Sequence, residues 1–335
     1  MIRLKSYLLL LICVLIFGFK ETSFHEYKIE GFAQGTTYVV KYYAKRETVN
    51  KNSIDSIMRA IDESMSLYLE QSLITKFNRS ESGFKMDHHF MKVYNEACRI
   101  SKETNGLFDA TIAPLVQLWG FGPKKIEKLP DEMSIITALN CVGMNKIEKE
   151  RMFLRKKVPC VKLDFNGIAQ GYTVDLIASF LKQRKLKYFM VEVGGELYVN
   201  DIKPNGQAFK IAIEGPLNSE LNSNGIKHVI EVKRGAVTTS GNYQKYIMNG
   251  KQRISHHINP KTGYPLENEM VSVTVYAKDA MTADGYDNAL MAMKVEEAIA
   301  FVARRRDIEA YMIYTKVNGE LADTLSSGFK KMIVN

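Results

Sequence analysis

The sequence has 335 residues, of which 46% are hydrophobic and 25% are charged, a balance typical of a folded globular protein rather than a disordered one. The formal net charge is +9, but the basic residues are not interleaved with aromatic ones, which excludes the usual pattern of a nucleic-acid binder. We expect instead a solvated basic face close to an anionic membrane.

The N-terminal segment, residues 1–24, is expected to be a signal peptide or an N-terminal membrane anchor. Arg3 and Lys5 precede an apolar run, Tyr7–Phe19, which is short for a membrane span and suits the core of a signal peptide. Cys13 gives only a weak version of the lipoprotein pattern, and no small-residue cleavage site is clear. We therefore expect export, with cleavage and anchoring both left open.

The rest of the chain, residues 25–335, is expected to form one domain. Because the sequence turns from apolar to polar at Lys20, residues before about Lys28 are expected to lie outside the folded core. The run Tyr38–Tyr43 is β-branched and aromatic, which predicts a strand.

Apolar residues at helical spacing predict a helix with its N-cap at Ser53, a second helix over Asp87–Asn105 that ends at Gly106, and a third from Tyr172 to Lys187. Further helices are predicted at Met281–Met293 and Val295–Arg304, and further strands at Tyr188–Val193, Glu196–Val199, Phe209–Ile213, His228–Val232, Val271–Ala277, Ala310–Tyr314 and Phe329–Val334. Helices and hairpins alternate without a regular βαβ rhythm. The predicted class is therefore α+β, with mixed, largely antiparallel sheets and packed helices, and a polar surface loop at Asn218–Asn224.

Three cysteines lie beyond the N-terminal segment, namely Cys98, Cys141 and Cys160. Their number is odd and their spacing is not that of metal ligands, so no disulfide framework is predicted. We expect buried free thiols.

The segment Thr282–Asn288 carries the strongest chemical signal. On a helix, Asp284, Asp287 and Asn288 stand at positions i, i+3 and i+4 and share one face. Two carboxylates and an amide oxygen suit a hard cation such as Mg²⁺. The alternative is a helix N-terminus with exposed acidic residues, which needs no ligand.

Three other segments combine glycine with polar or aromatic residues. Asp164–Tyr172 enters a helix through glycines, so its backbone N–H groups can hold phosphate, although an ordinary loop-to-helix junction has the same pattern. In Ser255–Gly263, His256 and His257 precede a rigid Asn-Pro turn and either is a possible base or a structural residue. Gly106–Gly122 places aromatic residues between glycines, which suits a wall for a planar ring or simple core packing, and Trp119 is expected to be core.

In their order along the chain and in their residue types, these segments resemble the motifs of the ApbE family, the FAD:protein FMN transferases. The similarity covers Gly35-Thr36, Ser66–Tyr68, Gly106–Gly122, Asp164–Asp175, Gly194-Gly195, Thr239–Tyr243, Ser255–Gly263 and Ala283–Met291, nearly all of the chain after its N-terminal segment. Members of this family are exported in many bacteria, often as lipoproteins. The resemblance therefore implies a periplasmic protein, with or without an anchor in the inner membrane.

The resemblance implies that FAD is the substrate, cleaved at its pyrophosphate so that FMN is joined by a phosphoester bond to a Thr or Ser of an acceptor protein and AMP is released. The implied acceptor is a flavoprotein subunit of a membrane redox complex. His256 is the implied group that activates the acceptor hydroxyl. The implied Mg²⁺ ligands are Asp284, Asp287, Asn288 and a backbone oxygen at Gly167, and the implied FAD contacts are Gln34, Tyr68, Leu107, Phe108, Asp109, Asp164, Gln170 and Ile258.

The chain departs from the family pattern at three positions. Gln34 stands where Met is common, Asn288 where Thr is common, and Gln170 where Lys or Glu is frequent. Two alternatives remain open: an FAD pyrophosphatase that releases FMN and AMP, and a flavin-binding assembly factor without turnover. Both acidic residues and His256 are present, which argues against the assembly factor.

Overall fold

The computed structural model describes residues 23–216, 226–242, 246–249 and 252–334. Residues 1–22 of the predicted N-terminal segment and the loop predicted at Asn218–Asn224 lie outside these ranges. Within them, no helix has both the length and the apolar character needed to cross a bilayer.

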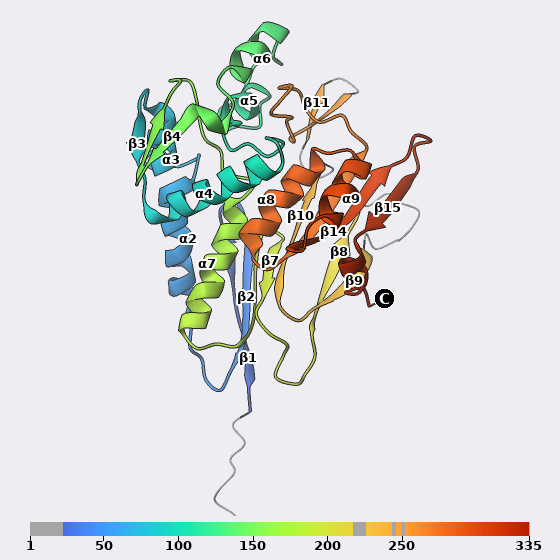
Figure 1. Ribbon diagram of the computed structural model, residues 1–335. Coiled ribbons are helices and arrows are strands. Elements are labelled where there is room, and N and C mark those ends of the chain that lie inside the picture. Colours follow the sequence, from blue (N-terminus) through green and yellow to red (C-terminus); the bar gives the residue numbers. More distant parts are fainter. Residues whose placement is uncertain (1–22, 217–225, 243–245, 250–251, 335) are drawn as a thin grey trace, which may run out of the picture.

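An eight-stranded antiparallel sheet forms the centre of the molecule (Figure 1). Its strands follow the order β1-β2-β6-β7-β10-β13-β14-β15, and neighbouring strands pair in antiparallel register throughout. Their bounds are β1 His25–Ala33, β2 Thr36–Ala44, β6 Tyr188–Val193, β7 Glu196–Val199, β10 Gly235–Gly241, β13 Met270–Ala277, β14 Ile308–Thr315 and β15 Leu321–Leu325. The predicted α+β class with largely antiparallel sheets is confirmed.

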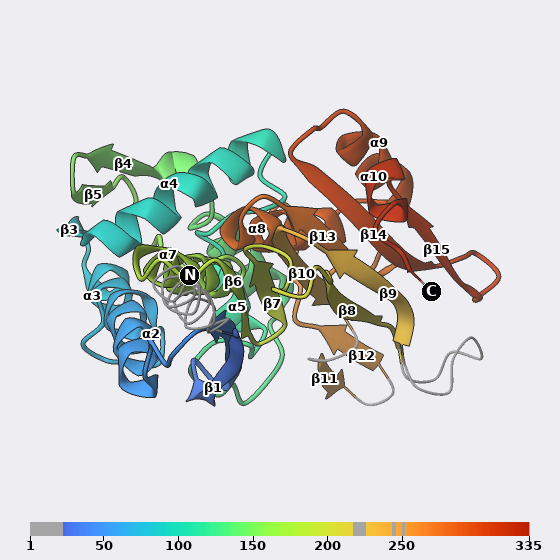
Figure 2. The same cartoon turned by 90° about the horizontal axis from the view of Figure 1, so that it is seen from below.

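Helices cover one face of this sheet and bury the main core against it (Figures 1 and 2). They are α2 Lys51–Met65, α3 Leu73–Arg79, α4 His88–Glu103, α7 Ala169–Gln183, α8 Ala280–Met291 and α9 Val295–Ala303. Helices α7 and α8 pack closely because Gly171 has no side chain: a Cβ there would lie 2.4 Å from the carbonyl oxygen of Ala280. This close approach fixes the position of α8, which carries the acidic segment.

The opposite face of the sheet is covered by the hairpin β8 Phe209–Glu214 and β9 Ile226–Val232 and by the short helix α10 Ser327–Lys330, which enclose a second core (Figure 2). At one end of the sheet, α5 Ala113–Leu118 and α6 Glu132–Leu139 share a third apolar cluster with β12 Gln252–Ser255, the partner of β11 Tyr246–Asn249. The predicted burial of Trp119 in this cluster is confirmed. A small sheet of β3 Gly83–Lys85, β5 Phe153–Lys156 and β4 Ile147–Glu150 flanks α4.

Several predicted boundaries are wrong. Strand β1 begins at His25, before the expected core boundary at Lys28, because pairing with β2 orders it. Helix α2 is capped by Asn50 rather than Ser53, since the Asn50 Oδ1 accepts from the Ser53 backbone N–H at 3.0 Å. The strand predicted at Phe329–Val334 is replaced by α10, because the carboxylate of Glu309 accepts from the Gly328 N–H and holds the chain in a helical turn.

The cysteine prediction is also wrong. Cys141 and Cys160 form a disulfide with a Cα–Cα distance of 5.4 Å, which leaves Cys98 as a free thiol among the described residues. The pairing joins the end of α6 to the segment that leads into Asp164, and it depends on a tertiary contact that residue spacing does not encode.

Candidate active site

The acidic segment lies on α8, as predicted, and its two carboxylates are buried. Asp284 and Asp287 are 3% and 1% exposed. Burial raises the pKa of both carboxyl groups, and their mutual repulsion raises that of Asp287 further. The alternative of an exposed acidic helix start is therefore excluded. Two ionised carboxylates buried side by side destabilise the fold unless one of them is protonated or a cation binds between them.

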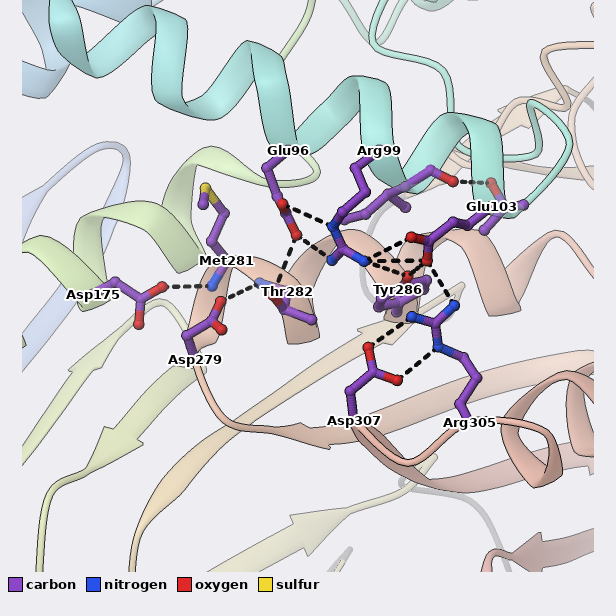
Figure 3. Close-up of polar contacts among 12 residues, drawn as sticks. Glu96, Arg99, Glu103, Asp175, Asp279, Met281, Thr282, Tyr286, Arg305 and Asp307 are labelled. Carbon is purple, nitrogen blue, oxygen red and sulfur yellow. Dashed lines mark hydrogen bonds and ion pairs between the residues drawn. The ribbon is translucent and has the colours of Figure 1, made fainter.

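Backbone N–H groups hold the start of α8 in place (Figure 3). Asp279 caps the helix by accepting from the Thr282 N–H, and Asp175 of α7 accepts from the N–H groups of Ala280 and Met281, all at 2.9 Å. The Gly171 N–H of α7 donates to Asp284 Oδ2 at 2.9 Å. That N–H was predicted to be available to a phosphate, and the fold uses it to orient a carboxylate instead.

Two further oxygen-bearing groups, the Gly167 carbonyl and the Asn288 amide, lie beside these carboxylates. The Asn288 Nδ2 lies 3.0 Å from Asp287 Oδ1, 3.5 Å from Asp284 Oδ1 and 3.4 Å from the carbonyl oxygen of Gly167. A half turn of the Asn288 amide brings its oxygen to the same place. Two carboxylates, one carbonyl and one amide are the oxygen donors that Mg²⁺ prefers, so the residues present fit such an ion. Among the described residues no cluster of three or more His, Cys, Asp and Glu side chains has metal-binding geometry.

The other side of α8 carries charges that are paired (Figure 3). Tyr286 donates its hydroxyl proton to Glu103 at the end of α4, while the guanidinium groups of Arg99 and Arg305 lie 5.5 and 4.5 Å from the centre of its ring. Arg99 also binds Glu96, and Arg305 binds Asp307 at 2.7 Å. Burial alone would raise the pKa of Glu103, but the hydrogen bonds from Tyr286 and Arg305 hold it below its ordinary value.

The loop after α4 and the segment before α7 run side by side. Asp109 accepts from the Thr111 N–H at 2.8 Å and from the Met144 N–H at 3.3 Å. The Asp164 N–H donates to the Ala110 carbonyl at 2.8 Å, and burial raises the pKa of the Asp164 carboxyl to about 6. The structure therefore places two of the predicted FAD contacts, Asp109 and Asp164, on adjacent segments.

A second group of predicted FAD contacts gathers where two hairpin turns meet α7. Gln34, in the β1–β2 turn, has a φ of +54° and accepts from the Thr173 hydroxyl at 3.3 Å. The Gln170 amide lies close to Gly194 of the β6–β7 turn, so that a Cβ at Gly194 would come within 2.9 Å of it. Both hairpin turns thus lie against the first residues of α7, among them Gln170.

The rings of the two histidines lie side by side and are tilted by 39°. Their ring centres are 4.0 Å apart, because the chain bends after β12 and the His257 N–H donates to the Ser255 hydroxyl at 3.2 Å. Neighbouring side chains of an extended strand would point to opposite sides, so the bend brings the two rings together. His256 also lies 6.2 Å, ring to ring, from Phe121 of the Gly106–Gly122 loop.

The remaining predicted FAD contacts differ in exposure. Tyr68, between α2 and α3, is 70% exposed, which leaves its ring free to stack on a planar group. Phe108 and Ile258 are buried, and Leu107 packs against the main core. Ile258 belongs to the third apolar cluster, in which α5 and α6 lie.

Three residues beside the acidic pair were not predicted as site residues. The Ser240 hydroxyl lies 3.5 Å from Asn288 Oδ1. Glu196 adds to the rise in the pKa of Asp287 that burial and Asp284 cause, and Thr238 opposes it. All three fall in or next to segments that the sequence does mark, Gly194-Gly195 and Thr239–Tyr243. Only the pairing of β7 and β10 shows that these segments meet.

Fold and site together define an α+β protein built on an eight-stranded antiparallel sheet, with a buried acidic cluster whose oxygen donors suit a cation. The family model for the ApbE family matches residues 34–312. The chain therefore belongs to the ApbE family.

Similar proteins carry a consistent name. The FAD:protein FMN transferase of Haemophilus influenzae is 34% identical over 318 residues, which are 91% of this chain and 90% of that protein. That of Vibrio cholerae is 33% identical over 98% of this chain and 99% of its own length. The solved flavin transferase ApbE from Vibrio cholerae superimposes with a TM-score of 0.83 at 31% identity, covering 92% of this chain and 99% of that one. ApbE from Pseudomonas stutzeri, in its apo form, gives 0.83 at 30% identity, covering 94% and 98%.

Proposed function

We propose that this protein is an FAD:protein FMN transferase, which cleaves FAD and attaches FMN through a phosphoester bond to a Thr or Ser of an acceptor protein. Two relatives that are 33 and 34% identical to this chain along nearly their whole length are named for this activity. The observation that carries the proposal is the buried, unneutralised pair Asp284 and Asp287 beside Gly167 and Asn288. Negative charge held in this way suits a cation that accompanies a pyrophosphate.

Mg²⁺ is the proposed cation, with Asp284, Asp287, Asn288 and the Gly167 carbonyl as its ligands. When bound, it would neutralise charge on the pyrophosphate, the main requirement of phosphoryl transfer. The protein's own contribution is positional. Gly171 and Asp175 fix the carboxylates by fixing α8 on α7.

The proposed flavin contacts come from the loop Leu107–Asp109, Asp164, Ile258 and the exposed ring of Tyr68, with Gln34 and Gln170 at the start of α7. These residues bind and orient FAD. His256 is the proposed base that removes the proton of the acceptor hydroxyl, which is a poor nucleophile at neutral pH.

We propose a periplasmic location, with residues 1–24 as export signal or membrane anchor and a subunit of a membrane redox complex as acceptor. The Cys141–Cys160 disulfide supports this location, since disulfides persist in the periplasm and are rare in the cytosol.

The test is incubation of the purified protein with FAD and Mg²⁺, with and without an acceptor protein, followed by intact mass measurement and nucleotide analysis. We expect the acceptor to gain the mass of FMN while one AMP appears for each modified acceptor. Free FMN at the same rate with or without acceptor would establish the pyrophosphatase instead. FAD binding without AMP would establish an assembly factor.

A matched pair of substitutions tests the base. His256→Ala should retain FAD binding and lose FMN transfer by roughly a hundredfold or more, the usual scale for removing a general base. His257→Ala removes the neighbouring ring and should cost less transfer. A larger loss at His257, or equal transfer in wild type and His256→Ala, would overturn the assignment.

A further inference from the structure

One end of the central sheet is strongly basic. Antiparallel pairing places the start of β1 beside the end of β2, and the start of β6 beside the ends of β2 and β7. The start of β10 and the end of β13 lie at this same end. In Figure 1 it is the lower end, where β1 is labelled, while α5, α6 and β11 lie at the upper end. We call the connections at the lower end, residues 45–50, 184–187, 200–208, 233–234 and 278–279, the basic end.

The basic end holds far more positive than negative charge. Its acidic residues are Glu47, Asp201 and Asp279, of which Asp201 pairs with Lys187 at 3.5 Å and Asp279 caps α8. Its basic residues are Lys45, Arg46, Arg184, Lys185, Lys187, Lys203, Lys233, Arg234 and Lys278, and all of these except the half-buried Lys203 are exposed.

Hydrogen bonds join these connections into one surface. The Asn200 side chain donates to the Lys187 carbonyl at 2.8 Å, and Arg234 Nε donates to the Asn200 carbonyl at 2.8 Å. The Tyr276 hydroxyl donates to the Arg234 carbonyl at 2.7 Å. The charges are therefore presented together, by backbone that the sheet holds in place.

The N-terminal segment joins the fold at this surface. Phe24, which is 43% exposed, packs edge-on against Tyr188 with ring centres 5.3 Å apart, next to Lys187. The apolar run ends at Phe19, so the chain from there to Phe24 spans roughly 17 Å at most when extended. A membrane that holds the apolar run would thus lie close to the basic end.

We propose that the basic end binds the anionic phospholipid headgroups of the membrane to which the chain is exported, an inference that rests on the proposed export. Lysines and arginines close to an anionic surface are attracted to it, and an exposed aromatic ring suits the headgroup layer. The α8 carboxylates and His256 then lie away from the bilayer. Ser240, whose hydroxyl is near Asn288, is in the part of β10 far from Gly235, and His256 directly follows β12, the partner of β11, at the upper end in Figure 1. The acceptor hydroxyl must come from a domain that stands clear of the membrane.

The experiment is lysine acetylation footprinting by mass spectrometry on the full chain, mixed with phosphatidylcholine vesicles that lack or contain phosphatidylglycerol. We expect Lys45, Lys185, Lys233 and Lys278 to be protected severalfold by phosphatidylglycerol, and protection to disappear at high salt. Lys124, Lys125 and Lys128 are exposed in the α5–α6 connection and serve as internal controls whose labelling should not change.

A charge variant provides the second measurement. Combining Lys45→Gln, Lys185→Gln, Lys233→Gln and Lys278→Gln should reduce the protection of the remaining Lys187 and Lys203 severalfold, while the matched change of Lys124, Lys125 and Lys128 to Gln should not. FMN transfer to a soluble acceptor should be unchanged in both, which shows that they fold and separates this proposal from the proposed activity. Three results would overturn the proposal that the basic end binds anionic lipid. They are equal labelling on both lipids, protection of the control lysines instead, and protection that needs an added acidic protein rather than the lipid.

Discussion

The negative charges on the two sides of α8 lie in opposite surroundings. On one side Asp284 and Asp287 face Gly167 and Asn288, and burial raises the pKa of both carboxyl groups. On the other side the carboxylate of Glu103 is neutralised by Arg305 and by the Tyr286 hydroxyl, and its pKa is lowered. The same helix therefore has one side whose charges are paired within the protein and one side that, under the proposed function, is completed by a cation.

This difference separates function from stability. Loss of a carboxylate on the unneutralised side removes charge that the fold does not need, whereas loss of the Glu103 carboxylate leaves the Tyr286 hydroxyl without its acceptor and takes one of two partners from each of Arg99 and Arg305. Substitutions on the two sides are therefore expected to have opposite effects on activity and on the free energy of unfolding.

The largest expected effect is that of Asp284→Ala. FMN transfer should fall by roughly a hundredfold or more, the scale seen when a charge-stabilising group is removed from an active site. The metal-free protein should be at least as stable as wild type, because a buried repulsion is relieved. Transfer rates and urea denaturation check both points, with Glu148→Ala, at the exposed ion pair with Lys157, as the control. Undiminished transfer would remove Asp284 from the site.

A smaller effect is expected on the paired side. Glu103→Gln should lower the free energy of unfolding by about 1 to 2 kcal/mol, because the group is partly exposed and water screens the loss. Transfer per folded molecule should change little. Glu70→Gln, at the exposed pair with Arg79, is the matched control and should leave unfolding unchanged. If Glu103→Gln abolished transfer without destabilising the protein, the two sides of α8 would not be separate.

The smallest effect is a pH dependence of stability. Folding raises the pKa of Asp284, and burial raises that of Asp175 to about 7, from an unfolded value of about 3.9. The free energy that these two protonated carboxyl groups contribute to folding is therefore largest below about pH 4, and it is lost as the pH rises towards 7. Thermal denaturation without divalent cations should show this decline, and Mg²⁺ should raise the midpoint more at pH 8 than at pH 5. An equal rise at both pH values would show that protons and Mg²⁺ do not compete.

Helical spacing was enough to predict that Asp284, Asp287 and Asn288 share a face, because that relation depends only on local geometry. It could not predict their burial, since α8 is surrounded by α7, α4 and the sheet and its hydrophobic residues follow no single face. The paired side was missed entirely: Glu103 and Tyr286 are 183 residues apart, and Glu103 and Arg305 are 202 apart.

Other errors have the same origin. The Cys141–Cys160 bond and the close approach of the His256 and His257 rings depend on where the chain bends in three dimensions, which residue spacing does not encode. Five strands of the central sheet, β2, β6, β7, β13 and β14, were predicted from their runs of apolar, β-branched and aromatic residues, whereas β1, β10 and β15 were not.

The most direct test of the account is calorimetric titration of Mg²⁺ into wild type, Asp284→Asn and Glu103→Gln, each saturated with FAD. If the unneutralised side of α8 binds the cation, wild type and Glu103→Gln will bind one Mg²⁺ with similar affinity, and Asp284→Asn will lose affinity at least tenfold. Equal affinity in all three proteins would contradict the account and place the cation elsewhere.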